Sequence, residues 1–496
     1  MHERGRFHLD IPKSCPFTIS KISLNSQSSY DTWLIREHDQ YGEYPHIYAK
    51  ICQTSSQHSR SCDQQGSRDD TWETVENHGQ DDHAADKVII LSDTGCGTEV
   101  PNMTMTQSSS LASNNQTPSK ARTRQSPGVW NLRTFLEYTI NPDGRIPYLV
   151  LTTHCHYDHI LGLAKLPSTA AESGLAPGDQ QRHCPSTTVL TSSHDKSFVT
   201  PYSNLQKHSL CGSVGLDAPT YTITWAPDMS VVTWHQSTGL GCGIPTPITV
   251  LHTPGHTPDS LSWYDADLRL LCVGDTFYVK ETDTTRESPW GPEPPMPTIF
   301  PSEGNVTDLR QTLKKLLDFV QARNKELSSQ KQNVVRRHSH RCAGWDQCGF
   351  NHHDQGDVPE PLFRDETAKS RVEDDWLFVD LHRGPPRVRL AAAHTTVSVD
   401  AEAAIVSFGK FMERVLRDEI PKVRVEDCGH GEERWLWDYA LQDDGQACKH
   451  GDESNGNASP NGDLRYLYRY SVMAPLRVIE EGRKNVLLDG YLTVNW

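Results

Sequence analysis

Short apolar runs recur along the chain, and each has the length and composition of a buried strand. The run from Tyr148 to Leu151 is a clear example, because its four apolar residues suit a strand that is shielded from water. The predicted strands are Tyr30–Arg36, His46–Ile51, Lys87–Leu91, Tyr148–Leu151, Thr187–Ser193, Pro247–His252, Leu261–Tyr264, Leu268–Val273 and Val388–Ala393.

Helical periodicity appears between these runs and after them. An amphipathic helix is predicted where apolar residues are spaced i, i+4, i+7, i+8 and i+11, at Leu309, Leu313, Leu316, Leu317 and Val320. We also expect a short helix at Asn131–Tyr138 and a later helix that begins after Asp400, whose carboxylate would cap it. Strands that alternate with helices indicate an α/β fold.

Four polar segments without apolar periodicity interrupt this pattern. They lie near residues 52–86, 98–128, 166–185 and 324–361, and we interpret them as disordered insertions. The expected organisation is an N-terminal tail at 1–29, one main domain at 30–420, and a C-terminal extension at 421–496 that packs on the same domain.

Composition narrows the classes of partner and compartment. The formal net charge of −16 over 496 residues argues against a nucleic-acid partner, because phosphate binding needs clustered Lys and Arg. The 13 cysteines are scattered and do not suggest a disulfide framework. No signal peptide or apolar stretch of membrane-spanning length is apparent. We therefore expect a cytoplasmic protein without a membrane partner, and the sequence leaves its oligomeric state open.

The strand at residues 148–151 leads into a cluster of side chains that bind metals. His154, His156, Asp158 and His159 lie within six residues, and imidazole nitrogen and carboxylate oxygen are ligands of zinc and similar ions. Other predicted strand ends carry the same residue types, at Asp93, His256, Asp275 and His394. Because an α/β sheet places its ligands at the carboxyl ends of its strands, these positions predict a shared metal site.

Taken in order, these motifs resemble those of the metallo-β-lactamase superfamily. The His-x-His-x-Asp-His signature is intact at residues 154–159, and the resemblance covers about residues 30–420, which would form the catalytic domain. It implies an αββα sandwich, with two mixed sheets face to face and helices outside. It also implies two divalent metal ions, of which zinc is the first candidate and iron or manganese the alternatives.

The resemblance assigns a role to each of the metal-binding side chains. The residues implied for one ion are His154, His156 and His256. Those implied for the other ion are Asp158, His159 and His394, with Asp275 bridging the two. Asp93 is implied to lie outside the ligands and to orient their imidazoles.

The residues expected to be catalytic are Asp158 and Asp275. Two ions would hold a bridging hydroxide that attacks a carbonyl, and Asp158 or a bound water would pass a proton to the leaving group. Tyr278 would either hydrogen-bond the carbonyl oxygen or pack against its neighbours. His394 lacks the flanking glycines of the usual fifth motif, so His382 and His430 are kept as substitutes.

The pairing of Asp158 with Asp275 resembles the dinuclear site of glyoxalase II and lactonases. This implies a hydrolase of small esters, thioesters, lactones or lactams. The alternatives are a phosphodiesterase or nuclease on the same fold, a single-iron persulfide dioxygenase, and a binding protein with a degenerate site. Polar, acidic insertions disfavour a nuclease, and the complete second set of ligands disfavours the other two.

Several other candidates receive a structural interpretation. Cys96 and Cys155 are expected to be buried packing residues, and His252 is expected not to bind metal. The histidines and cysteines from His338 to His353 are interpreted as part of a solvated loop, with a small structural zinc site as the alternative.

Overall fold

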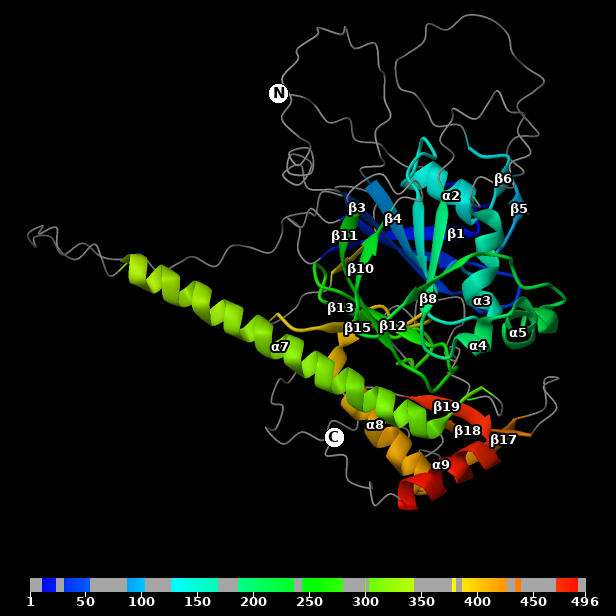
Figure 1. Cartoon of the computed structure of the whole chain (residues 1–496), viewed down its shortest axis with the longest axis vertical. Helices are drawn as coiled ribbons and strands as arrows, with labels where there is room; N and C mark the ends of the chain where they lie inside the picture. Colours follow the sequence, from blue (N-terminus) through cyan, green and yellow to red (C-terminus); the bar gives the residue numbers. More distant parts are fainter. Residues whose placement is uncertain are drawn as a thin grey trace, which may run out of the picture.

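The computed structural model describes residues 11–23, 31–53, 87–102, 126–167, 186–235, 243–279, 299, 303–342, 377–380, 386–425, 433–438 and 470–488. Two mixed β-sheets form the body of this described part, and helices lie against their outer faces (Figure 1). The predicted αββα sandwich is confirmed.

The first sheet has eight strands in the order β14-β1-β2-β3-β4-β7-β8-β9. Strands β1 to β4 pair antiparallel in sequence order, whereas β4, β7, β8 and β9 run parallel. Their bounds are β1 (Phe17–Ser23), β2 (Thr32–Glu37), β3 (His46–Gln53), β4 (Lys87–Ser92), β7 (Tyr148–Leu151), β8 (Thr187–Ser192), β9 (Ile223–Ala226) and β14 (Leu377–Asp380).

The second sheet has six strands in the order β10-β11-β12-β13-β15-β16. Only β13 and β15 pair in parallel, so this sheet is also mixed. The bounds are β10 (Val231–Trp234), β11 (Ile244–His252), β12 (Leu261–Asp265), β13 (Leu270–Cys272), β15 (Arg389–Ala391) and β16 (Val399–Asp400). A separate two-stranded ribbon joins β5 (Val100–Pro101) and β6 (Val129–Trp130).

The core between the sheets follows from strand periodicity. Along β7, Leu149 and Leu151 point into the layer between the sheets, whereas Tyr148 and Val150 point to the outer layer. A hydrogen bond of 2.7 Å from the indole Nε1 of Trp263 to Ser92 Oγ joins the two sheets. All four residues of β7 are buried, which explains its uninterrupted apolar sequence.

Helices cover both outer faces. Those near the first sheet are α2 (Leu132–Thr139), α3 (Tyr157–Ile160), α4 (Lys196–Val199) and α5 (Tyr202–His208), with short 3-10 turns at Leu161–Lys165 and Cys211–Val214. Those over the second sheet are α7 (Val306–Cys342), α8 (Ala401–Leu416) and α9 (Leu476–Leu488). The predicted cap of α8 is confirmed, because Asp400 Oδ1 accepts a hydrogen bond of 2.9 Å from the Ala403 amide.

The C-terminal part adds a third sheet, in the order β17-β18-β19. Its strands are β17 (Lys422–Val425), β18 (Arg434–Asp438) and β19 (Ser471–Pro475). Trp437, Tyr470 and Val472 are buried in the same apolar cluster as α7 and α8, and Tyr470 donates a hydrogen bond of 2.9 Å to the Ala404 carbonyl. In Figure 1 this sheet and α9 lie beside α8, at the end of the molecule opposite α2.

Two expectations about the chain's organisation are corrected. The segment expected as an N-terminal tail contains β1, because Phe17 and Ile19 alternate with polar residues and enter the core beside β2. The polar insertion expected from residue 324 is helical as far as Cys342, so α7 is much longer than predicted. Residues 321–342 contain no Gly or Pro and many good helix formers, which outweighs their lack of apolar periodicity.

The other expectations about insertions fall largely outside the described residues. Residues 54–86, 103–125, 168–185 and 343–361, which make up most of the predicted insertions, are outside the described residues. The nine predicted strands are all present, with ends that differ by a few residues.

Candidate metal centre

The candidate metal-binding residues all follow the carboxyl ends of strands. β4 leads to Asp93, and β7 leads to the segment 154–159. In the second sheet, the loops after β11, β13 and β15 carry His256, Asp275 and His394. Backbone hydrogen bonds tie these loops together, from Thr94 N to His159 O at 2.8 Å, from Leu261 N to Thr153 O at 2.7 Å and from Ala393 N to Gly274 O at 3.1 Å.

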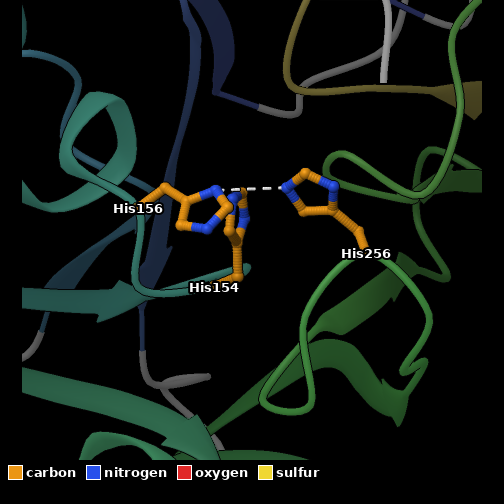
Figure 2. A group of neighbouring side chains, drawn as sticks. All are labelled: His154, His156 and His256. Atoms are coloured by element: carbon orange, nitrogen blue, oxygen red, sulfur yellow. Dashed lines mark hydrogen bonds between the residues drawn. The ribbon is translucent and has the colours of Figure 1, made fainter. Parts of the chain in front are cut away.

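The first group of side chains consists of His154, His156 and His256, all buried. One potential ligand atom from each lies within 4.8 Å of the others. The rings face a common space, and His156 Nδ1 lies 3.2 Å from His256 Nε2 (Figure 2). This is the geometry of three imidazoles that can bind one ion.

The second group consists of Asp158, His159, Asp275 and His394, which are also buried and within the same distance limit. Asp158 Oδ2 lies 3.1 Å from His159 Nε2 and 3.2 Å from His394 Nε2. His394 is thus brought to the site as expected, while its substitutes His382 and His430 lie outside the described residues.

The carboxylate of Asp275 lies between the two groups. Its Oδ2 is 3.4 Å from His159 Nε2 in the second group. The same oxygen is 3.9 Å from the Nε2 atoms of both His154 and His256 in the first group. A single carboxylate therefore reaches both sets of imidazoles, as a bridging ligand must.

For two of the ligand rings, a hydrogen bond on the far nitrogen determines which nitrogen faces the site. His394 Nδ1 donates to the carbonyl of Glu43 at 2.8 Å, so its Nε2 is left as the ligand atom. His159 Nδ1 lies 3.1 Å from Asp93 Oδ2, which likewise leaves its Nε2 toward Asp158. Imidazoles held by a carboxylate or carbonyl in this way are typical of metal sites.

Asp93 lies behind the ligands rather than among them. Its Oδ1 accepts a hydrogen bond of 2.7 Å from the Thr153 amide, and its Oδ2 accepts one of 2.8 Å from the Thr153 hydroxyl. The backbone of Asp93 has φ of 62°, a left-handed conformation that Asp tolerates better than most residues. This carboxylate therefore fixes both His159 and the start of the histidine segment.

The donor set fits metal ions in a further respect. Within the described residues, the buried atoms His154 Nε2 and Asp275 Oδ1 have no hydrogen-bond partner. Unsatisfied buried polar atoms are costly, and a bound cation is a common reason for their presence. Imidazole nitrogens and carboxylate oxygens accept zinc, iron or manganese, so the ligands leave the identity of the metal open.

Electrostatics within the site favour ionised carboxylates. Burial disfavours the ionised form of Asp158, yet His159 and His394 hold its pKa well below the usual range. Burial alone would lower the pKa of His394, but the charges of Asp275 and Asp158 raise it to about 9. A metal ion that binds here must displace the protons these groups share, so binding will release protons.

Tyr278 lies beside the second group. Its ring centroid is 5.4 Å from that of His394, and burial together with the charge of Asp275 raises the pKa of its hydroxyl well above the usual range. The side chain is only 4% exposed, so it contacts the site from inside the protein.

The remaining candidates take the structural roles expected of them. Cys96 and Cys155 are buried and belong to neither group of ligands. His252 also lies apart, with its Nδ1 3.0 Å from Ser192 Oγ and its ring stacked on His194. For the cluster from His338 to His353, the side chains lie outside the described part of the chain.

Two contacts to the ligand imidazoles escaped sequence reasoning. Glu303 Oε2 lies 3.2 Å from His156 Nε2, and the Glu43 carbonyl binds His394. Neither residue lies in a recognisable motif, and both are more than 100 residues from their partners. No local pattern marks them.

A narrow crevice adjoins both groups. Apart from the site residues, its walls are mostly apolar and include residues of α7, α8 and β19. The lining residues are His256, Asp275, Thr276, Ile299, Leu309, Phe408 and Val472. The crevice is too narrow for a water molecule in this conformation.

Comparison with known proteins agrees with this geometry. The sequence pattern described as "Metallo-beta-lactamase superfamily" matches residues 90–330, which include both groups except His394. The chain belongs to the metallo-β-lactamase superfamily and has two His/Asp clusters consistent with a dinuclear metal site.

Individual relatives are distant. The Aspergillus versicolor protein avaE, whose name proposes a role as a transcription factor, is 29% identical over 162 residues, or 30% of this chain. The chain matches only 41% of that protein's length.

Among the described residues, none of the helices combines the length and the hydrophobicity that a membrane-spanning segment requires.

Solved structures show the same general likeness. A β-lactamase domain protein from Burkholderia ambifaria is 12% identical with a TM-score of 0.35, covering 78% of this chain and 72% of that one. The protein TTHA1623 in a di-iron-bound form is 21% identical with a TM-score of 0.21, covering 37% of this chain and 70% of that one. These scores are too low to support an inference about chemistry.

Proposed function

We propose that this protein is a metal-dependent hydrolase that cleaves an ester, thioester, lactone or lactam bond in a small molecule. The observation that carries the proposal is the position of Asp275, whose carboxylate lies within 3.9 Å of imidazoles from both groups. A complete set of buried donors for two ions has little structural use, because seven such side chains are costly to bury without a cation.

Two divalent ions bound to these donors supply an activated water near neutral pH and a Lewis acid for the carbonyl oxygen. The chain's own residues prepare the site for that chemistry. The Asp275 carboxylate contacts imidazoles of both groups. Neighbouring histidines hold the pKa values of Asp158 and Asp275 well below the usual range, so both carboxylates are ionised. Asp158 is the residue we assign to carry a proton to the leaving group, because its carboxylate contacts both His159 and His394.

The surroundings favour a substrate with an apolar part. The crevice beside Asp275 is lined by Ile299, Leu309, Phe408 and Val472, which would contact carbon rather than charge. Tyr278 packs beside His394, and we assign its hydroxyl to hydrogen-bond a substrate carbonyl. Substrate entry requires wall side chains to move, because the crevice is narrow.

Other activities on this fold are less well supported. The name of the Aspergillus versicolor relative refers to a transcription factor, but the net charge of −16 of this chain disfavours binding to the phosphate backbone of DNA. The same charge disfavours a nuclease. A persulfide dioxygenase needs one ion, and here the second group is complete.

The test combines metal analysis with a substrate panel. Purified protein should hold two divalent ions per chain after reconstitution, and it should hydrolyse at least one member of a panel of esters, thioesters, lactones and lactams. The variants Asp158→Ala and Asp275→Ala should lose this activity. Asp318→Ala, which removes an exposed carboxylate on α7, is the matched control and should keep it.

Two results would overturn the proposal. One is a folded protein that binds no zinc, iron or manganese. The other is a protein that hydrolyses only a phosphodiester included in the panel, which would identify a phosphodiesterase instead.

A further inference from the structure

The carboxylate of Glu303 contacts two imidazoles next to the first group of ligands. Its carboxylate is buried, with 6% of the side chain exposed. One oxygen, Oε2, lies 3.2 Å from His156 Nε2, and the other, Oε1, lies 3.0 Å from His208 Nδ1 on α5. The carboxylate thus links a candidate metal ligand to a helix on the other side of it.

The two ring nitrogens of His156 face different partners. Nδ1 faces His256 Nε2 at 3.2 Å and lies on the side of the metal group. A ring that gives Nδ1 to a metal keeps its proton on Nε2, and that proton needs an acceptor. Glu303 Oε2 is in the position to accept it.

A carboxylate suits this position better than an amide. His208 Nδ1 also points to Glu303, so two ring N–H groups converge on two oxygens. Glutamine has one oxygen and one NH₂ group, so one of the two imidazoles would face a donor instead of an acceptor. The contact therefore depends on the charge and on both oxygens.

Packing fixes both the His208 ring and the chain segment that carries Glu303. The ring of His208 stacks on Phe198, with centroids 4.2 Å apart and planes at 29°. On the other side, Asn305 N donates to the Gly255 carbonyl at 2.8 Å, next to His256. The start of α7 is tight against this loop, because a Cβ on Gly255 would lie 2.6 Å from Leu309 Cα.

We propose that Glu303 is a positioning residue that fixes the tautomer and orientation of His156 for the first metal ion, with His208 as its anchor. This inference rests on the metal centre of the proposed function. Partners of ligand imidazoles typically change metal affinity 10- to 100-fold when they are removed. We expect a loss of about that size for the first ion, and little change for the second, whose ligands do not contact Glu303.

The experiment measures metal affinity rather than turnover. Metal-free full-length protein is titrated with Co²⁺ or Zn²⁺ against a chromophoric chelator, and the visible spectrum of bound Co²⁺ reports ligand geometry. Glu303→Gln should weaken one of the two binding steps by roughly 10- to 100-fold and alter the Co²⁺ spectrum. Glu303→Asp, which keeps the charge on a shorter side chain, should recover part of the affinity.

Two further variants separate orientation from general stability. His208→Ala leaves the acceptor for His156 in place but removes its anchor, so it should weaken the same step by a smaller factor. Glu326→Gln changes an exposed glutamate on α7 and should bind both ions as the unaltered protein does.

Each outcome decides a separate point. If the unaltered protein binds no metal, the proposed function fails. If it binds two ions and Glu303→Gln binds them with the same affinities, only the role of Glu303 is refuted. Should Glu303→Gln fail to fold by circular dichroism, the decision falls to Glu303→Asp and His208→Ala, and unchanged affinities in both would refute the role.

Discussion

The turn after β4 depends on a glycine that leaves room for a buried glutamate. Gly95 has φ of 75°, and a Cβ at this position would lie 1.7 Å from Glu37 Oε2. Glu37 accepts hydrogen bonds of 2.7 Å each from the amides of Cys96 and Thr98. Gly95→Ala must therefore displace the Glu37 carboxylate and leave both amides without their acceptor.

The size of the effect follows from these losses. A left-handed alanine costs about 1–2 kcal/mol, offset by roughly 0.4–1 kcal/mol from the unfolded state. Each buried amide that loses its acceptor adds about 1–3 kcal/mol. With two amides, we expect Gly95→Ala to lower the free energy of unfolding by about 2–8 kcal/mol.

Gly42 offers a matched control. Its φ is 83°, and a Cβ at this position would meet nothing within 4 Å, so Gly42→Ala carries the backbone cost alone. Urea unfolding followed by fluorescence of the 12 tryptophans measures both variants. In a Glu37→Ala background the extra cost of Gly95→Ala should disappear. Equal destabilisation by Gly95→Ala and Gly42→Ala would refute the reasoning.

Two more predictions concern pH and metal removal. Burial, together with the charge of Asp39, raises the pKa of Glu37 from an ordinary 4.5 to about 7. The protonated form is therefore favoured by folding, so the stability that Glu37 contributes is complete below pH 4.5 and is lost as the pH rises to about 7. Urea unfolding at both ends of this range should show that the unaltered protein loses about 3 kcal/mol relative to Glu37→Gln, and parallel pH profiles would contradict this. Removal of metal with a chelator should lower the free energy of unfolding by about 2.7 kcal/mol for each bound ion when free metal was 100 times Kd. Thermal melts should show a smaller loss in Asp275→Ala, and equal losses would count against Asp275 as a ligand.

The ligand groups were predictable because each lies in a short local pattern. His154 to His159 follow one apolar strand, and Asp275 follows another, so sequence alone indicates that they meet at one edge of the fold. His394 was harder, since its flanking residues are atypical, but its place after an apolar run was enough. The structure brings all seven residues together.

The parts that sequence could not predict depend on contacts between distant segments. Glu303 lies 147 residues from His156, and its neighbours carry no motif. The strand β1 was missed because Phe17 and Ile19 give only a brief alternation. The length of α7 was missed because its second half has helix-forming residues but no apolar face to reveal them.

The ligands are divided between the two sheets, and this division has a consequence for stability. The first group takes His154 and His156 from the loop after β7 and His256 from the loop after β11. The second group is divided in the same way, with Asp158 from one sheet and Asp275 from the other. Each ion would therefore act as a cross-link between the two halves of the sandwich. By thermodynamic reciprocity, whatever loosens the packing of the sheets far from the site must also weaken metal binding.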